Sequence, residues 1–118
     1  MTAERDYRDF LNDMVLACRS IIRFVDGMSL DDYLADEKTR DAVMRAFEIL
    51  GGAVRHLPEP IKTANADIPS ATMTAVRDRI AHGYFGIDDS IQFTTVDQDP
   101  KPLLPRLEAL AREHGVGQ

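Results

Sequence analysis

Apolar residues recur at steps of three and four positions along the first part of the chain, and this spacing predicts an amphipathic helix. The predicted helix runs from about Ala3 to Val25, with Gly27 beyond it in a position suited to a left-handed cap. Its apolar stripe consists of Tyr7, Leu11, Met14, Val15, Cys18, Ile21, Ile22 and Val25. Ser29-Leu30-Asp31-Asp32 has the form of a capping box and predicts a short second helix from Leu30 to Ala35.

A second, longer stripe predicts a helix from about Glu37 to His56. Its apolar members are Val43, Ala46, Phe47, Leu50, Ala53, Val54 and Leu57. Gly51 and Gly52 lie inside this helix, where each glycine costs roughly 1 kcal/mol relative to alanine. We therefore expect another helix to approach closely there. Leu57-Pro58-Glu59-Pro60 then interrupts the helical pattern.

Asp67-Ile68-Pro69-Ser70 predicts the start of a further helix, which ends near Gly83 or Tyr84. The residues expected on its buried side are Met73, Val76 and Ile80. The following Gly86-Ile87-Asp88-Asp89 is predicted to be a loop.

The segment from Ser90 to Val96 allows two interpretations. Ile91, Phe93 and two threonines are typical of a strand, whereas the surrounding pattern is helical. After it, Asp99-Pro100 predicts the start of a last helix, which continues through Leu103, Leu104, Leu107, Leu110 and Ala111. The tail over residues 115–118 is expected to fray.

The pattern as a whole predicts an all-α, antiparallel helical bundle of about five helices with one short extra helix. A chain of 118 residues fits one domain, spanning 1–118, with a single core. Hydrophobic residues make up 44% and charged residues 29%, as in soluble globular proteins. No apolar run approaches the roughly 18 residues that span a bilayer, and the polar start resembles no signal peptide. We therefore expect no membrane partner and a cytoplasmic location, which also suits the single cysteine, Cys18.

The net charge of −6 argues against a protein that coats nucleic acid non-specifically, because such binding needs many Lys or Arg contacts with phosphates. It leaves room for a small cleft with local positive charge. Arg77 and Arg79 would supply that charge as phosphate-binding residues, and a twofold axis would double it.

The chemistry of the chain is concentrated in Arg77-Asp78-Arg79-Ile80-Ala81-His82-Gly83-Tyr84. The planar guanidinium of an arginine donates two parallel hydrogen bonds to phosphate oxygens, and histidine moves protons near neutral pH. Together they indicate chemistry on a phosphodiester. No metal cluster and no glycine-rich phosphate loop competes for this role, so we predict neither a metal site nor a cofactor.

The cysteine and the other two histidines have no spacing typical of metal ligands. Cys18 lies on the apolar stripe of the first helix and is expected in the core. His56 stands at a helix end and is expected to interact with the helix dipole. His114 is expected to be exposed to solvent in the tail.

Four segments occur in a characteristic order along the chain. They are Asp36-Glu37-Lys38-Thr39-Arg40-Asp41-Ala42-Val43, Gly51-Gly52-Ala53, Asp67-Ile68-Pro69, and residues 77–88 with the pattern Arg-x4-His-x-Tyr. In this combination the chain resembles the HepT-like family of small all-helical proteins, which is part of the HEPN superfamily. The resemblance extends roughly from the first helix to the last.

The resemblance implies a homodimeric, metal-independent endoribonuclease that acts on RNA as the toxin of a type VII toxin–antitoxin pair. The antitoxin would be a minimal nucleotidyltransferase that silences the toxin by transferring AMP to the motif tyrosine. Carried over by position, Arg77 and His82 would be catalytic, and Asp78 would be the polar residue that follows the arginine. Tyr84 would be the modified residue.

This sequence departs from the family pattern at three positions. Family members often have Gly-Glu-Ala where this chain has Gly51-Gly52-Ala53, so a helix carboxylate is missing at Gly52. Tryptophans are common where this chain has Ser70 and Phe93. We expect these departures to affect packing, dimer contacts and partner or nucleotide contacts more than the site itself.

RNA cleavage without a metal needs a group that accepts the 2′-OH proton, a group that protonates the leaving 5′-oxygen, and positive charge near the phosphorane. His82 can serve one proton transfer, and Arg77 can hold the non-bridging oxygens. Because each chain supplies only one motif histidine, a second copy across a twofold axis would complete the acid–base pair.

Helix geometry adds a condition to this mechanism. Arg77 and His82 lie about 140° apart around an ideal helix, so either the long arginine curls round or the helix distorts before Gly83. Asp78, four residues before His82, does share its face. A carboxylate there could orient the imidazole and favour its protonated form.

Two other interpretations remain open. Arg77, Asp78 and Arg79 could form a solvated helix face, with Tyr84 anchoring the next loop, in a structural helical dimer. Alternatively, the chain could be a catalytically weak binding module that mainly docks a nucleotidyltransferase. A growth assay with and without the neighbouring gene would separate the enzyme from the binding module.

Overall fold

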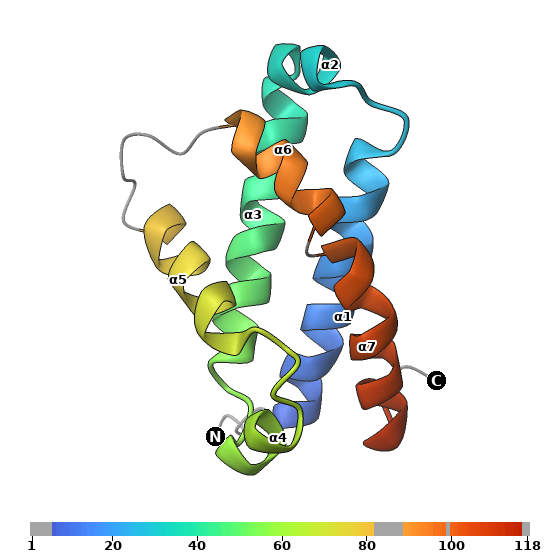
Figure 1. Cartoon of the computed structure of the whole chain (residues 1–118), viewed down its shortest axis with the longest axis vertical. Helices are drawn as coiled ribbons and strands as arrows, with labels where there is room; N and C mark the ends of the chain where they lie inside the picture. The colour runs from blue at the N-terminus through green and yellow to red at the C-terminus, as the bar shows by residue number, and fades with distance from the viewer. Residues whose placement is uncertain (1–5, 82–88, 99, 117–118) are drawn as a thin grey trace, which may run out of the picture.

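The computed structural model describes residues 6–81, 89–98 and 100–116, and within these ranges it contains seven helices and no strand (Figure 1). The helices are α1 (Tyr7–Val25), α2 (Leu30–Ala35), α3 (Glu37–Val54), α4 (Glu59–Ala64), α5 (Ser70–Ala81), α6 (Asp89–Gln98) and α7 (Pro100–Glu113). The predicted all-α fold is confirmed. No helix in the described part of the chain is both long and apolar enough to cross a membrane.

The start of α1 lies later than the sequence pattern predicted. Asp6 has an extended backbone, and its carboxylate accepts a hydrogen bond from the Arg8 backbone N–H at 2.9 Å. Asp6 is therefore the N-cap, and the described helix begins at Tyr7 rather than Ala3. Gly27 has the predicted left-handed conformation, with φ of 76°.

The capping box before α2 is confirmed in both directions. The backbone N–H of Asp32 donates to the Ser29 hydroxyl at 3.1 Å, and the backbone N–H of Ser29 donates to the Asp32 carboxylate at 3.0 Å. These two bonds satisfy N–H groups that a helix start leaves without partners. They allow a helix of only six residues to form over Leu30–Ala35.

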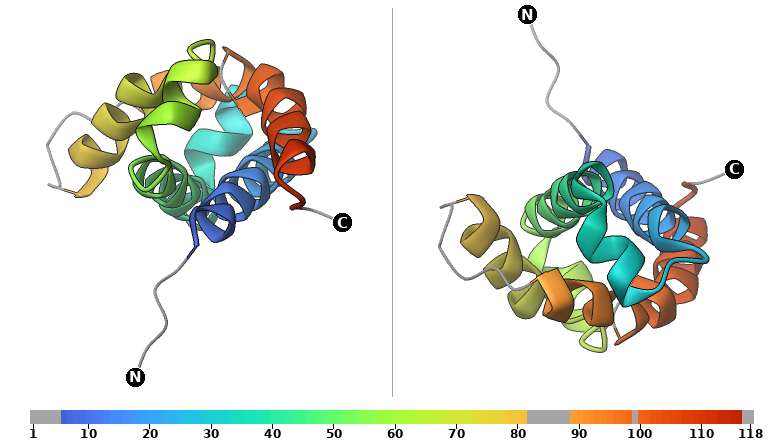
Figure 2. Two further views of the ribbon diagram at one scale, coloured as in Figure 1. Left: turned by 90° about the horizontal axis from the view of Figure 1, so that it is seen from below. Right: turned by 90° about the horizontal axis from the view of Figure 1, so that it is seen from above.

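Helix α3 is the central element of the fold. It lies between α1 and α5 (Figure 2), begins after the Asp36 cap and ends at Val54, two residues before the predicted end at His56. Every member of its predicted stripe is buried. The apolar face of α3 therefore forms the wall on which the other helices pack.

Helix α4 was not predicted, and for α6 a helix was one of the two interpretations left open. In α4, Pro60 lies in the first turn, where the missing N–H of proline costs no hydrogen bond. In α6, the hydroxyls of Thr94 and Thr95 donate to the carbonyls of Ser90 and Ile91, four residues earlier. These bonds accommodate β-branched residues in a helix.

Packing also favours the helical form of the ambiguous segment. Val96 is buried, and the Phe93 ring lies 5.0 Å from the ring of Tyr33 on α2. The tertiary contacts of α6 thus override the strand propensity of its residues. Asp89, expected in a loop, is the first residue of the helix.

The buried side chains form one cluster that draws on α1, α3 and α7 above all, and Cys18 is fully buried in it as predicted. Burial raises the pKa of the Cys18 thiol to about 12. The prediction that His114 is exposed to solvent was wrong. Its side chain is half-buried, and its Nδ1 atom lies 2.9 Å from the Tyr7 hydroxyl. His56 is exposed as a helix-end residue, with its ring stacked on Phe10 at a centroid distance of 4.2 Å.

Candidate active site

The motif arginine is carried by α5, which packs on α3 at the edge of the bundle (Figure 1). Helix α5 follows Ile68-Pro69, and the Met73 backbone N–H donates to the Pro69 carbonyl in its first turn. The described helix extends through Ala81, so Arg77, Asp78 and Arg79 all have helical backbone. The Arg77 side chain is half-buried.

Gly51 sets how closely α5 approaches α3. A Cβ atom at Gly51 would meet the Met73 carbonyl oxygen and the Arg77 Cβ well inside the 3.0 Å that real Cβ atoms keep. Only glycine allows the two helices to approach this far. The predicted close approach at the glycine pair is confirmed at Gly51, and the helix that approaches is the one that bears Arg77.

Gly52 has different surroundings from Gly51. A Cβ built at Gly52 has one described atom within 4 Å, the Nε of Arg77 at 4.0 Å. No other atom of the described residues lies within this distance, and Gly52 is half-buried. Close helix packing therefore explains Gly51 but does not explain Gly52.

The structure reports on only part of the predicted site. It describes the side chain of Arg77, and the backbone of Asp78 and Arg79. The predicted base His82 and the predicted modified residue Tyr84 lie outside the described residues, as does the predicted helix end near Gly83. The relation of Arg77 to His82 therefore remains a prediction.

An ion pair between Arg40 and Asp89 joins α3 to α6, and the sequence pattern did not predict it. The Arg40 guanidinium lies 3.4 Å from the Asp89 carboxylate at the start of α6 and donates to the carbonyls of Tyr33 and Leu34 at the end of α2. One side chain thus ties α2, α3 and α6 together. Burial and the nearby Asp89 raise the pKa of Tyr33 to about 12. Arg40 lies in the segment that carried the resemblance, but nothing in its spacing indicated this contact.

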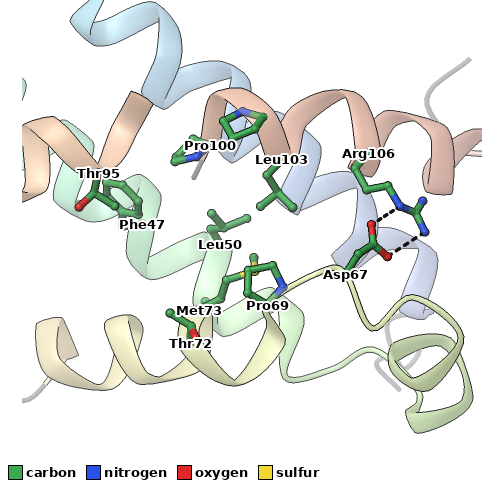
Figure 3. A pocket seen from close by; sticks show the side chains of 12 residues that line it. Phe47, Leu50, Asp67, Pro69, Thr72, Met73, Thr95, Pro100, Leu103 and Arg106 are labelled. Atoms are coloured by element: carbon green, nitrogen blue, oxygen red, sulfur yellow. Dashed lines mark hydrogen bonds and ion pairs between the residues drawn. The ribbon is translucent and has the colours of Figure 1, made fainter. Parts of the chain in front are cut away.

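A pocket of about 450 Å³ opens between α3, α5 and the α6–α7 side of the bundle (Figure 3). Its walls are mostly apolar, and they include Phe47, Leu50, Met73, Pro100 and Leu103. Met73 and Gly51, which both line the pocket, also belong to the contact between α3 and α5 at Arg77. The pocket therefore reaches this contact, although its described lining does not include Arg77 itself.

Asp67 and Arg106 close one end of this pocket (Figure 3). The Arg106 Nε donates to the Asp67 carboxylate at 2.7 Å, and the same guanidinium donates to the Asn65 side-chain oxygen. The hydrogen bond from Arg106 lowers the pKa of Asp67 below its ordinary value. The pair ties the segment before α5 to α7, which helps to fix where α5 begins.

In the described part of the chain, no three His, Cys, Asp or Glu side chains come together in a group that could hold a metal ion.

The described part of the candidate site is the half-buried Arg77, on helix α5, which Gly51 allows to pack closely against α3. Comparison with protein families adds the decisive observation: the model described as "Ribonuclease HepT-like" matches residues 3–110. The chain belongs to the HepT-like ribonuclease family.

Individual HepT-like relatives resemble this chain over most of its length. The "Probable ribonuclease HepT" of Thermococcus cleftensis is 35% identical over 109 residues, which cover 92% of this chain and 99% of that protein. A "Putative RNase" of Methanocaldococcus jannaschii is 39% identical over 88 residues, 75% of this chain and 73% of that protein. No solved structure matches the chain.

A further relative shows that the HepT-like unit also occurs inside a longer protein. The "Gamma-glutamylcyclotransferase and putative RNase" of M. jannaschii is 27% identical over 104 residues, which cover 88% of this chain but 45% of that protein. The family match confirms the resemblance inferred from the motif segments. It supports an RNase function, with RNA as the substrate.

Proposed function

We propose that this HepT-like protein is a metal-independent endoribonuclease in which Arg77 and His82 are catalytic and Asp78 orients the histidine. The observation that carries the proposal is the family match over residues 3–110. It is supported by the way Gly51 holds the Arg77-bearing helix against α3. A residue that must meet a phosphate reproducibly benefits from a rigid support of this kind.

The proposed reaction is an attack of the ribose 2′-oxygen on the adjacent phosphorus. The 2′-OH loses its proton to a general base, and the bond to the 5′-oxygen breaks as that oxygen receives a proton from a general acid. His82 from each of two protomers would supply these two roles across a twofold axis. Arg77 and Arg79 would stabilise the negative charge on the phosphorane. The products are a 2′,3′-cyclic phosphate and a free 5′-hydroxyl.

In the cell, the homodimer would act as a cytoplasmic toxin whose antitoxin is a minimal nucleotidyltransferase. Transfer of AMP to Tyr84 would place a phosphate beside Arg77 and His82, where it would occupy the charge meant for the RNA. Residues 1–118 would form one domain for all of these roles. This part of the proposal rests on the motif Arg77 to Tyr84 together with family membership.

Cleavage of a single-stranded RNA in excess EDTA tests the proposed chemistry. We expect undiminished cleavage and a 2′,3′-cyclic phosphate end, because the 2′-OH is a nucleophile that needs no metal-bound water. Activity that EDTA abolishes and Mg²⁺ or Mn²⁺ restores would contradict the mechanism. A protein that binds the nucleotidyltransferase but neither cleaves RNA nor slows growth without it would instead be the binding module.

A further inference from the structure

The pocket between α3, α5 and the α6–α7 side of the bundle has apolar walls and one polar end (Figure 3). Phe47, Met73 and Leu103 are among the side chains of its walls, and its volume is about 450 Å³. Concave apolar sites of this size with a few polar groups are typical of ligand-binding sites. The polar groups at the end therefore decide which chemistry the pocket can bind.

The polar end is formed by Arg106, whose guanidinium is held in a fixed orientation. Its Nε donates to the Asp67 carboxylate at 2.7 Å, and its Nη2 donates to the Asn65 side-chain oxygen. Asn65 is buried, and its own amide nitrogen donates to the Ile61 carbonyl at 2.8 Å. Among the described residues, the Nη1 atom of Arg106 has no hydrogen-bond partner. An arginine that is already in position thus has N–H groups to offer to a ligand.

The polar end and the opposite part of the pocket have different neighbours along α5. Asp67 precedes the N-terminus of this helix, whereas residues 82–88 follow its last residue, Ala81. A helix of 12 residues is about 18 Å long. The groups at the polar end are therefore described residues. Farther along, Gly51 and Met73 bring the lining of the pocket to the helix contact at Arg77.

The pair of Asp67 and Arg106 favours a neutral ligand over a charged one. Because the two charges compensate each other, a phosphate in the pocket would gain little attraction from Arg106 and would meet the Asp67 carboxylate. A purely apolar ligand would take both partly exposed side chains away from water without offering partners. A nucleobase avoids both costs, because it is neutral, has apolar faces and carries hydrogen-bond donors and acceptors on its edge.

We propose that this pocket binds one nucleobase of the RNA substrate. The base lies between the apolar walls, the Nη1 atom of Arg106 donates to an acceptor on its edge, and the Asp67 carboxylate accepts from an N–H group. The inference rests on the proposed function, because an RNA substrate is what brings a base to a pocket beside the helix contact at Arg77. It adds a base-binding site to a motif that accounts for phosphate binding and proton transfer.

Binding of two matched oligonucleotides tests the site. One is a single-stranded RNA hexanucleotide that contains all four bases, and the other is a hexamer of abasic ribose phosphates with the same backbone charge. The protein carries His82→Ala, so that neither ligand is cleaved. We expect the Kd of the RNA to be about tenfold lower than that of the abasic hexamer, because one base is buried in an apolar site.

Three further variants show whether this tenfold ratio arises in the pocket. Thr72 is exposed and lines the pocket, so the ring of Thr72→Phe should occupy it and reduce the ratio to less than about twofold. Thr63→Phe, on an exposed residue of α4 that does not line this pocket, is the control and should keep the ratio. Arg106→Lys keeps the charge but loses the planar guanidinium, and it should reduce the ratio to about threefold. A merely structural role of either residue would weaken both ligands equally and leave the ratio unchanged.

The methyl signal of Met73 reports on occupation of the pocket by NMR. In protein with labelled methionine methyl groups, Met73→Leu identifies this signal among those of the five methionines. The RNA should shift the signal, because an aromatic base changes the chemical shift of a methyl group beside it, and the abasic hexamer should not. A signal that stays unmoved at saturating RNA, or an unchanged Kd ratio in Thr72→Phe, overturns the base-binding site.

Cleavage of RNA by the wild type in excess EDTA, measured beside these titrations, separates the two possible failures. If the protein cleaves RNA while the Met73 signal stays unmoved, only the base-binding site is overturned. If RNA shifts the Met73 signal but is not cleaved, only the proposed endoribonuclease function is overturned. If free guanosine shifts the signal with the same Kd as the hexanucleotide, the pocket is a site for a free nucleoside, and its assignment to RNA is overturned.

Discussion

Gly51 on α3 lies directly under the Cβ atom of Arg77 on α5, so close that no side chain fits between them. The contact joins the two helices at Arg77, the residue that we propose to be catalytic. Because backbone and Cβ atoms cannot move aside as a flexible side chain can, the glycine determines the distance between the helices. The position of Arg77 thus depends on a residue 26 positions earlier in the chain.

Substitution of the two adjacent glycines, Gly51 and Gly52, by alanine should change the free energy of unfolding in opposite directions. Gly51→Ala forces α5 away from α3, and we expect a loss of about 1–3 kcal/mol in the free energy of unfolding, as for other overpacked sites. Gly52→Ala meets only an ordinary contact among the described residues, with Arg77 Nε at 4.0 Å, and should stabilise α3 by up to about 1 kcal/mol through helix propensity. Urea unfolding of both variants measures this difference. Equal stability of the two variants would contradict the close approach at Gly51.

Arg77→Ala and His82→Ala should each reduce RNA cleavage by about 10²-fold or more, because each removes stabilisation specific to the transition state. Helix content and melting temperature should change little. Arg112→Ala, which removes a basic residue from the last turn of α7, is the control and should cleave normally. If His82→Ala unfolds the protein, the histidine is structural and the catalytic assignment fails.

The protein should be a homodimer in solution at micromolar concentration, because the one motif histidine of each chain cannot supply both proton transfers. We expect the interface to include α5 and to bury well over ~1,000 Å² in total. Light scattering should give twice the chain mass of 13.2 kDa. A mass of one chain, in a preparation that cleaves RNA, would exclude the two-histidine mechanism.

Tyr84 should be the acceptor of AMP. Incubation with ATP, Mg²⁺ and the partner nucleotidyltransferase should add the mass of AMP less water at this residue and silence cleavage, since the added phosphate competes for Arg77. Tyr84→Phe should cleave RNA but escape silencing. Peptide mass spectrometry locates the modification, and AMP found on Tyr84→Phe protein would refute the assignment.

Removal of the Asp67–Arg106 pair should destabilise the protein in a pH-dependent way. The pKa of Asp67 is lowered by the hydrogen bond from Arg106, so its contribution is present above the ordinary value of 3.8 and is lost as the pH falls through the lower folded-state value. Asp67→Asn should therefore be less stable than the wild type near neutral pH, and the difference should shrink below pH 3.8. Asp26→Asn, at the exposed end of α1, is the control.

The sequence alone determined the elements whose signals are local. The apolar stripes of α1 and α3 and the capping box at Ser29 depend on residues within one or two helical turns, and the structure confirms all three. The motif with Arg77 could likewise be recognised, because its order and spacing are read directly from the chain. The family match confirms the family resemblance that this motif and the other segments carried.

Only the tertiary structure decided what depends on contacts between distant residues. The helical form of α6 is supported by the packing of Phe93 and Val96, since its own residues also allow a strand. The Arg40–Asp89 and Asp67–Arg106 pairs join residues far apart in the chain, and no local spacing indicates such partners. Gly51 and Gly52 look alike in the sequence, and they differ because 100° of helix rotation turns one toward α5 and the other beside the Arg77 guanidinium.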